Sequence, residues 1–205
     1  MTTEIKTAVV IVGSGSAGLA AAVWLAQSHI PFRMLERRGG PLTEGQADGV
    51  QCRTVEIYES LGIAEELLRE AYHVMELAFW SADEGDGRGG GEGTGEGAVG
   101  GEGKGKTGRL VRKNRAADTP VGLSHQPHLI LNQARMNGLL LGKLREWAPE
   151  QEVEYGHEVT AVCTNADGAG DAGDTYPIQV TAVHQGQEKV YKAKYVLVSY
   201  TTPCH

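Results

Sequence analysis

The feature that most constrains the fold is a glycine-spaced turn near the amino terminus. The turn, Gly13–Gly18, reads G-S-G-S-A-G, follows the β-branched run Ala8–Val12 and leads into the apolar run Leu19–Ala26. A strand, a glycine turn and a helix in this order form the unit that holds the diphosphate of a dinucleotide. The sequence therefore predicts an α/β protein with a Rossmann-like βαβ unit.

Each glycine of the turn has its own physical role in such a unit. Gly13 permits the tight turn out of the strand, Gly15 leaves room for the phosphates, and Gly18 lets the helix pack closely against the sheet. The backbone N–H groups and the dipole at the start of the helix both favour an anion. We therefore expect these three glycines to bind the cofactor.

A second apolar run, Pro31–Leu35, ends in Glu36, where this fold has an acid for a ribose hydroxyl. An acid at this position favours the ADP half of FAD or NAD over NADP. The next residues, Arg37 and Arg38, could either meet phosphates or form a solvated strand end. The competing interpretation is a glycine-rich turn before an ordinary amphipathic helix, which the ordered strand, helix, strand and acid disfavour.

Length and charge exclude several classes of protein. The chain has 205 residues and a formal net charge of -7, which indicates one domain without the basic surface of a nucleic-acid binder. No apolar run is long enough to span a membrane and no basic signal sequence opens the chain, so we expect a cytoplasmic protein. The cysteines have no C-x-x-C spacing, which indicates neither a disulfide framework nor a metal site: Cys52, Cys163 and Cys204.

The clearest helix after the βαβ unit is Gln133–Trp147, which Asn132 would cap and Pro149 would end. Three strands then form a β-meander, and the last run, Tyr195–Val198, could return to the parallel sheet. Periodicity gives the remaining elements: helices at Thr54–Leu61 and Ala64–Ala71, and strands at His73–Trp80, His128–Leu131, Val153–Cys163, Ile178–Val183 and Val190–Val198.

A glycine-rich tract interrupts the chain at residues 84–108. From Gly85 to Gly108, thirteen of the 24 residues are glycine, so this tract is predicted to be a flexible surface insertion. Within it, Gly100–Thr107 satisfies the phosphate-loop pattern G-x-x-x-x-G-K-[ST]. That pattern needs a strand before it and a helix after it, and Gly-Glu repeats supply neither. We therefore reject a phosphate-loop nucleotide hydrolase.

A second motif, Gly45–Thr54, reads G-Q-A-D-G-V-Q-C-R-T. With this segment the chain resembles the flavin-dependent aromatic hydroxylases of the phenol 2-monooxygenase type, which carry a very similar segment after the second strand of their FAD domain. The resemblance extends over Ala8–Trp80 and Gly122–Trp147 and continues weakly through the meander. It implies that the cofactor is FAD, and that the whole chain, 1–205, is the amino-terminal part of one FAD-binding domain.

The resemblance also implies roles for individual residues. The glycine turn would lie under the FAD diphosphate, Glu36 on the adenosine ribose, and the loop that begins at Gly45 beside the flavin ring. The cofactor-binding residues implied in this way are Gly13, Gly15, Gly18, Glu36, Arg37, Arg38, Gly45, Gln46, Ala47 and Gln133.

Asp48 is similar in position to an acid that faces the bound phenol in these hydroxylases. A carboxylate there could orient the hydroxyl or remove its proton, which makes the ring carbon a better nucleophile. From the sequence alone, the favoured interpretation of Asp48 is an ordinary turn aspartate before Gly49, and only the resemblance around it reverses this preference. In such enzymes NADPH reduces the flavin, and one oxygen atom of O2 enters the ring beside the hydroxyl.

The resemblance implies a second flavin motif, Gly-x-Asp-Gly, where this sequence reads Ser199–His205. We therefore expect an amino-terminal fragment that ends before that motif and is inactive alone, derived from an NAD(P)H-dependent aromatic monooxygenase with a small phenolic substrate. The alternative is a non-catalytic module or regulator that binds flavin or nucleotide. The sequence leaves the oligomeric state open.

Overall fold

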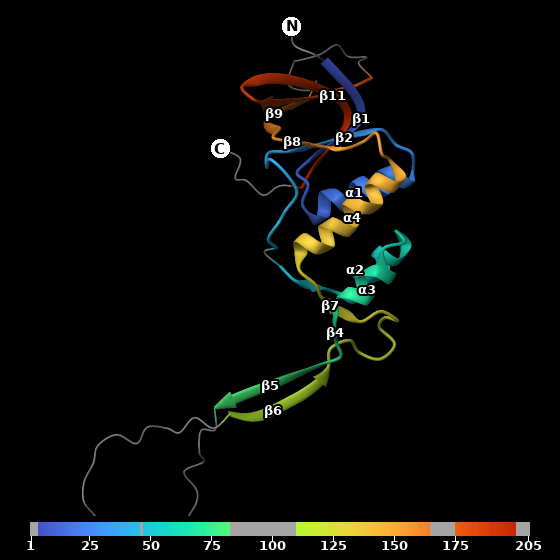
Figure 1. Cartoon of the computed structure of the whole chain (residues 1–205), viewed down its shortest axis with the longest axis vertical. Helices are drawn as coiled ribbons and strands as arrows, with labels where there is room; N and C mark the ends of the chain where they lie inside the picture. Colours follow the sequence, from blue (N-terminus) through green and yellow to red (C-terminus); the bar gives the residue numbers. More distant parts are fainter. Residues whose placement is uncertain (1–3, 46, 83–109, 165–174, 200–205) are drawn as a thin grey trace, which may run out of the picture.

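The computed structural model describes residues 4–45, 47–82, 110–164 and 175–199 (Figure 1). The elements in this part of the chain are β1 (Glu4–Val12), α1 (Ser16–Gln27), β2 (Phe32–Glu36), β3 (Gly49–Val50), α2 (Cys52–Ser60), α3 (Ala64–Glu70), β4 (Tyr72–Val74), β5 (Glu76–Ala82), β6 (Leu110–Ala117), β7 (His128–Ile130), α4 (Gln133–Trp147), β8 (Val153–Tyr155), β9 (Glu158–Thr164), β10 (Ile178–His184) and β11 (Gln187–Val198).

Some features of the sequence lie outside the described residues. They are the insertion at 84–108 with its phosphate-loop pattern, Gln46, Cys204 and the residues that follow Ser199. The predictions for these positions stay predictions.

A six-stranded sheet organises the molecule, in the order β8-β2-β1-β11-β10-β9. The first four strands are parallel, and β10 and β9 continue the sheet in antiparallel fashion. β11 belongs to both parts, because it pairs with β10 along one edge and with β1 along the other, as far as Val12 opposite Val198. The Rossmann-like α/β fold, with a β-meander that returns to the parallel sheet, is therefore confirmed.

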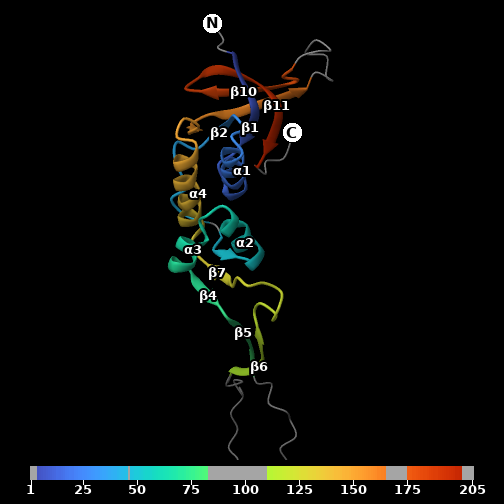
Figure 2. The same ribbon diagram turned by 90° about the vertical axis from the view of Figure 1, so that its right-hand side faces the viewer.

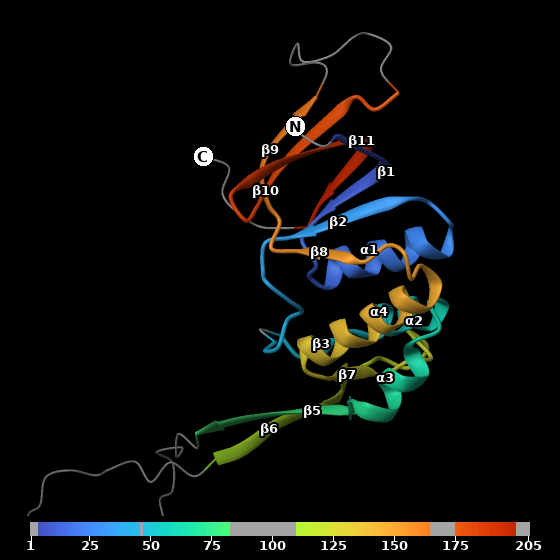
Figure 3. The ribbon, with the colours of Figure 1, turned by 45° about the horizontal axis from the view of Figure 1, so that its top comes forward.

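Alternating burial along β1 divides the core into two clusters. Val9 and Ile11 pack with the helices, whereas Val10 packs with Leu35 and Tyr191 on the other face of the sheet. This is the two-residue period of a strand that is buried on both faces. Helices α1 and α4 lie side by side against the first face (Figure 3). The sheet and these two helices position the ends of β1 and β2 for the site.

Two smaller sheets extend away from the main one (Figure 2). β3, β7 and β4 form one, and β5 and β6 form a two-stranded ribbon. The prediction of a single strand over His73–Trp80 was wrong, because the chain changes partners at Met75: β4 pairs with β7, whereas β5 pairs with β6.

The prediction of one strand over Val153–Cys163 was also wrong. Gly156 has a φ of 71°, and it separates β8, which is parallel to β2, from β9, which is antiparallel to β10. Two hydrogen bonds fix the break to the end of β2: Gly156 N donates to Arg38 O at 2.8 Å and His157 N donates to Glu36 O at 2.9 Å. A left-handed residue between the strands lets the chain leave one neighbour and join another.

The long helix was predicted with its observed bounds, Gln133–Trp147. The side chain of Asn132 accepts a hydrogen bond from Ala134 N at 2.9 Å, so the predicted cap is confirmed.

Candidate dinucleotide-binding site

The glycine turn joins the carboxyl end of β1 to the amino end of α1. Gly13 has a φ of 98°, which glycine adopts without strain, and its N–H donates to Leu35 O at 2.8 Å. Gly15 is the N-cap residue of α1, and its carbonyl accepts from Leu19 N at 2.9 Å. The turn therefore sets the amino end of α1 at the carboxyl edge of the sheet, an arrangement that favours anions.

Gly15 and Gly18 meet different surroundings. A Cβ atom on Gly18 would lie 2.1 Å from Gly13 O and 2.7 Å from the Oγ of Ser199, whereas a Cβ atom on Gly15 would meet nothing within 4 Å. Gly18 is thus required by packing between the helix and the turn. Gly15 borders open space, which leaves room for a phosphate group at the start of α1.

Glu36 lies at the end of β2 with a side chain that is only 6% exposed. Its Oε2 accepts hydrogen bonds from Ser14 N at 2.7 Å and Ser14 Oγ at 2.9 Å. Arg38 donates from Nη2 to Oε2 at 2.9 Å and from its backbone N and its Nε to Oε1 at 3.0 Å. The carboxylate is therefore fully engaged within the protein, because it offers about four acceptor positions.

These contacts control the charge of Glu36. Burial by itself would raise its pKa, but the hydrogen bonds from Arg38 and Ser14 outweigh burial and lower the pKa from 4.5 to about 2. Arg38 also donates to Ser14 Oγ at 3.3 Å. A further hydrogen-bond donor could reach the Glu36 carboxylate only by replacing one of these donors. Arg37, by contrast, is exposed.

The loop that begins at Gly45 rests on the first residues of α4. Gln133 N donates to Ala47 O at 3.1 Å, and Leu131 N donates to Asp48 O at 2.8 Å. A Cβ atom on Gly45 would lie 2.8 Å from Gln133 N. The second glycine motif thus meets Gln133 directly, although the two are far apart in the sequence.

Gly45→Ala is expected to lower the free energy of unfolding by about 1–3 kcal/mol, because the new methyl group collides with backbone at the start of α4. Urea unfolding followed by circular dichroism measures this change. The matched control is Gly142→Ala on the same helix, where a Cβ meets nothing within 4 Å. This control should stabilise the chain by about 0.5–1 kcal/mol, and equal effects of the two substitutions would contradict the proposed contact.

Three polar side chains link α4 to α1. Gln133 Nε2 donates to Ser16 Oγ at 3.3 Å, and Ser16 Oγ donates to Asn137 Oδ1 at 2.8 Å. Asn137 is 2% exposed. Gln133 and Asn137 are one helical turn apart and therefore present their side chains to the same neighbour.

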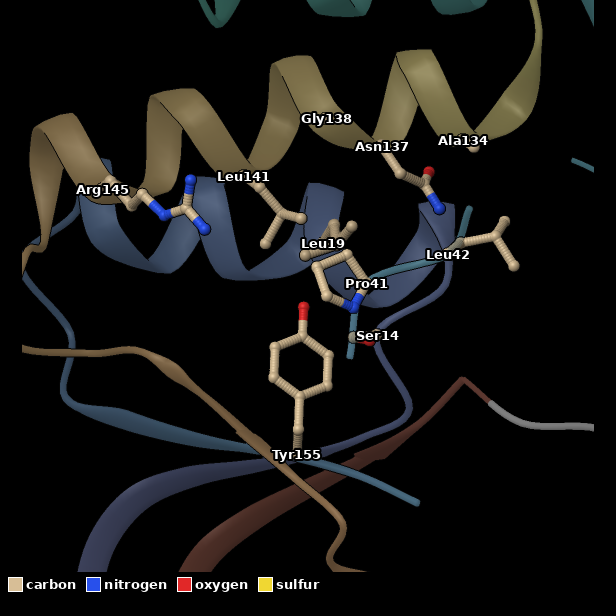
Figure 4. Close-up of a pocket in the computed structure, with 10 residues that line it drawn as sticks. All are labelled: Ser14, Leu19, Pro41, Leu42, Ala134, Asn137, Gly138, Leu141, Arg145 and Tyr155. Carbon is tan, nitrogen blue, oxygen red and sulfur yellow. The ribbon is translucent and has the colours of Figure 1, made fainter. Parts of the chain in front are cut away.

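A cavity of about 220 Å³ lies beside this link, between α1, α4, β8 and the segment that follows β2 (Figure 4). The Tyr155 side chain rises into it from β8, and the Arg145 guanidinium approaches it from α4. Burial raises the pKa of the Tyr155 phenol, so it stays a neutral hydroxyl at physiological pH. The lining residues are Ser14, Leu19, Pro41, Leu42, Ala134, Asn137, Gly138, Leu141, Arg145 and Tyr155.

The predicted residues therefore fall into two groups. The glycine turn, Glu36, Arg38, Gly45, Ala47 and Gln133 border the amino ends of α1 and α4. Asp48 is exposed just before β3.

Two further observations concern what the described residues lack. None of their helices is long and apolar enough to cross a membrane. In the same part of the chain, no three His, Cys, Asp or Glu side chains cluster as metal ligands would.

A comparison with protein families matches residues 6–197 to a family described as FAD binding domain. The chain belongs to this family. The open space over Gly15 and the cavity between α1 and α4 are compatible with an FAD-binding domain, because a diphosphate would have room at the start of α1.

Individual relatives of this FAD-binding domain are monooxygenases. The FAD-dependent monooxygenase terD of Aspergillus terreus is 50% identical over 194 residues, which are 95% of this chain and 28% of that protein. The 3-hydroxybenzoate 4-monooxygenase of Comamonas testosteroni is 35% identical over 195 residues, 92% of this chain and 27% of that protein. The resemblance to flavin-dependent aromatic hydroxylases is thereby confirmed, and the chain spans less than a third of the length of these curated relatives.

A solved structure shares the fold. The flavin-dependent monooxygenase PieE, crystallised with FAD and substrate, superposes with a TM-score of 0.67 at 20% identity. The match covers 94% of this chain and 30% of PieE.

Three polar residues that line the cavity were not predicted as site residues from the sequence: Asn137, Arg145 and Tyr155. Asn137 was hidden within an apolar helical stripe, and its one signal was the four-residue spacing from Gln133. Tyr155 was placed within a continuous strand, so its position at the end of β8 beside Glu36 could not be inferred.

Proposed function

We propose that this chain binds FAD and forms the FAD-binding portion of an NADPH-dependent monooxygenase that hydroxylates a phenolic substrate. The observation that carries the proposal is that Gln133 connects the glycine turn to Ala47, because its side chain donates to Ser16 Oγ and its backbone N–H donates to Ala47 O. The turn alone suits any dinucleotide, whereas Gly45 and Ala47 belong to the motif that the resemblance to flavin-dependent hydroxylases implies beside the flavin. The name of the 3-hydroxybenzoate 4-monooxygenase relative supports a phenolic substrate class.

The diphosphate end of FAD would be held by Gly13, Gly15 and Gly18 at the start of α1. Glu36 would accept a hydrogen bond from an adenosine ribose hydroxyl in exchange for one of its present donors, Ser14 or Arg38. Where the ribose replaces Arg38, the freed Arg38 side chain, with Arg37 beside it, would provide positive charge near the phosphates.

The flavin end would lie beside Gly45, Gln46 and Ala47, with Gln133 in contact with the cofactor. Gln133 already binds Ala47 through its backbone N–H and Ser16 through its side chain. Gln133 would therefore hold in place both the segment beside the flavin, at Ala47, and the glycine turn, at Ser16.

Asp48 would act on the substrate. When bound, FAD supplies the redox chemistry, which takes electrons from NADPH and delivers one oxygen atom of O2 to the ring. The exposed carboxylate of Asp48 would accept the phenolic hydrogen bond or proton, which makes the ring carbon beside the hydroxyl more nucleophilic. The remaining task of the protein is to position the ring and exclude water.

Titration of the purified chain with FAD tests the binding half of this proposal. We expect saturable quenching of flavin fluorescence at one FAD per chain. A chain that melts cooperatively and yet leaves FAD fluorescence unchanged would contradict it.

The activity is tested with a chimera in which this chain replaces the matching quarter of 3-hydroxybenzoate 4-monooxygenase. We expect NADPH oxidation that depends on the phenolic substrate and yields hydroxylated product. Asp48→Asn in the same chimera should bind FAD equally and lower kcat about 10²- to 10⁴-fold. A chimera that binds FAD but forms no product, with or without Asp48, would favour the non-catalytic module instead.

A further inference from the structure

The amide of Asn137 is the most completely enclosed polar group beside the cavity. The residue is 2% exposed and projects from α4 toward the first residue of α1. Its immediate helical neighbours in the core are leucines, among them Leu140 and Leu141. An amide in such surroundings needs partners for both its oxygen and its nitrogen.

The direction of the hydrogen bonds leaves the nitrogen of this amide unsatisfied. Gln133 Nε2 can only donate, so the hydroxyl of Ser16 accepts from it and turns its own hydrogen toward Asn137 Oδ1. The oxygen of Asn137 is therefore paired. Its Nδ2, with two hydrogens, has no hydrogen-bond partner among the described residues.

The unpaired nitrogen is directed toward the wall of the cavity, and the atom itself has almost no exposed surface. In Figure 4 the Nδ2 atom of Asn137 is directed toward Leu42 and away from the axis of α4. A buried donor without an acceptor is costly, and a cavity next to it offers space in which a ligand can supply one.

Two further features indicate what kind of acceptor would bind. Ser16, which the amide touches, is the first residue of the twelve-residue helix α1, whose amino end favours negative charge. Arg145 brings a guanidinium to the same cavity. A donor and a helix terminus at one end of this cavity suit the oxygen atoms of a diphosphate, and Arg145 adds positive charge at the opposite end, about two helical turns along α4.

We propose that Asn137 donates a hydrogen bond from Nδ2 to a diphosphate oxygen of the bound cofactor. This inference rests on the proposed function, and it adds a side-chain contact to the cofactor that the glycine motif does not supply. The cofactor diphosphate would then be held from two helices, by the backbone of α1 and by a side chain of α4. The competing role is purely structural, in which Asn137 only ties α4 to α1 through Ser16.

Two substitutions separate these roles. Asn137→Asp keeps the acceptor for Ser16 but replaces the donor with a negative charge, so it preserves the link between the helices and repels a diphosphate. Asn137→Leu removes the donor without adding charge, and it keeps the test decisive if the aspartate variant fails to fold. Leu144→Met, a volume-conserving change in the same helix, is the matched control.

The measurement is the Kd of the 205-residue chain for FAD, from flavin fluorescence, and for ADP, from calorimetry. We expect Asn137→Leu to weaken both ligands about 10- to 100-fold, Asn137→Asp to weaken both further, and Leu144→Met to leave both unchanged. The inference is overturned if the Asn137 variants melt at a lower temperature but bind FAD and ADP within twofold of the unsubstituted chain. Asn137 would then have a structural role alone. An unsubstituted chain that binds neither ligand would refute the proposed function itself.

Discussion

Gly18→Ala is expected to destabilise the fold more than the same substitution at Gly15 or Gly45. The new Cβ would lie 2.1 Å from the carbonyl oxygen of Gly13 and 2.7 Å from Ser199 Oγ. The oxygen belongs to a backbone turn that is itself bonded to β2, so α1 must move away from the sheet to relieve the collision. We expect a loss of about 3 kcal/mol or more in the free energy of unfolding, measured by urea titration.

Gly15→Ala is the matched control, because it adds the same methyl group three residues away. A Cβ at this position meets no atom within 4 Å, so the loss of stability should stay at about 1 kcal/mol or less, which is the usual cost of alanine at an N-cap. Its effect should instead fall on FAD, whose Kd we expect to rise at least about tenfold, since the methyl group occupies the space proposed for a phosphate. Unchanged FAD affinity in Gly15→Ala would contradict the proposal that the diphosphate binds at this end of α1.

Acid is expected to unfold the chain partly through Glu36. Its pKa falls from 4.5 to about 2 in the folded state, because the hydrogen bonds from Arg38 and Ser14 outweigh the effect of burial. The unfolded chain therefore binds a proton at higher pH than the folded chain. The stabilisation, about 3 kcal/mol, is fully present above pH 4.5 and is lost as the pH falls toward 2.

Melting of the chain and of Glu36→Gln between pH 7 and pH 2.5 measures this contribution. The variant should be less stable at pH 7 and should lose less stability below pH 4.5. Glu154→Gln is a suitable control, since this carboxylate also pairs with an arginine, Arg33, through a more exposed contact. Identical acid profiles for the chain and for Glu36→Gln would show that Glu36 does not carry the effect.

The parts of the fold that the sequence predicted are those decided by local chemistry. The roles of Gly13 and Gly18 follow from backbone geometry within six residues, and the bounds of α4 follow from a cap at Asn132 and a stripe of leucines. Both are set by neighbours in the chain, so a single sequence contains the relevant information.

The parts that the sequence did not predict depend on partners that are distant in the chain. His73–Trp80 and Val153–Cys163 each read as one strand, and each divides because its two halves pair with different strands. In the same way, the position of Glu36 was predictable. The hydrogen bonds that its carboxylate accepts from Ser14 and Arg38 were not, because they require the glycine turn and the end of β2 to meet in space.

The pairing of β1 with β11 has a consequence for how the chain comes to fold. Glu4 lies opposite Val190, so the central ladder of the sheet joins residues that are 186 positions apart. Contacts of such long range form slowly, because the loop that they close must first lose its freedom. On a ribosome, β1 would be finished long before β11 emerges, and its free edge and apolar side chains would stay available to other chains. Pairing of β11 with β1 is thus the step that removes this edge from contact with other newly made chains.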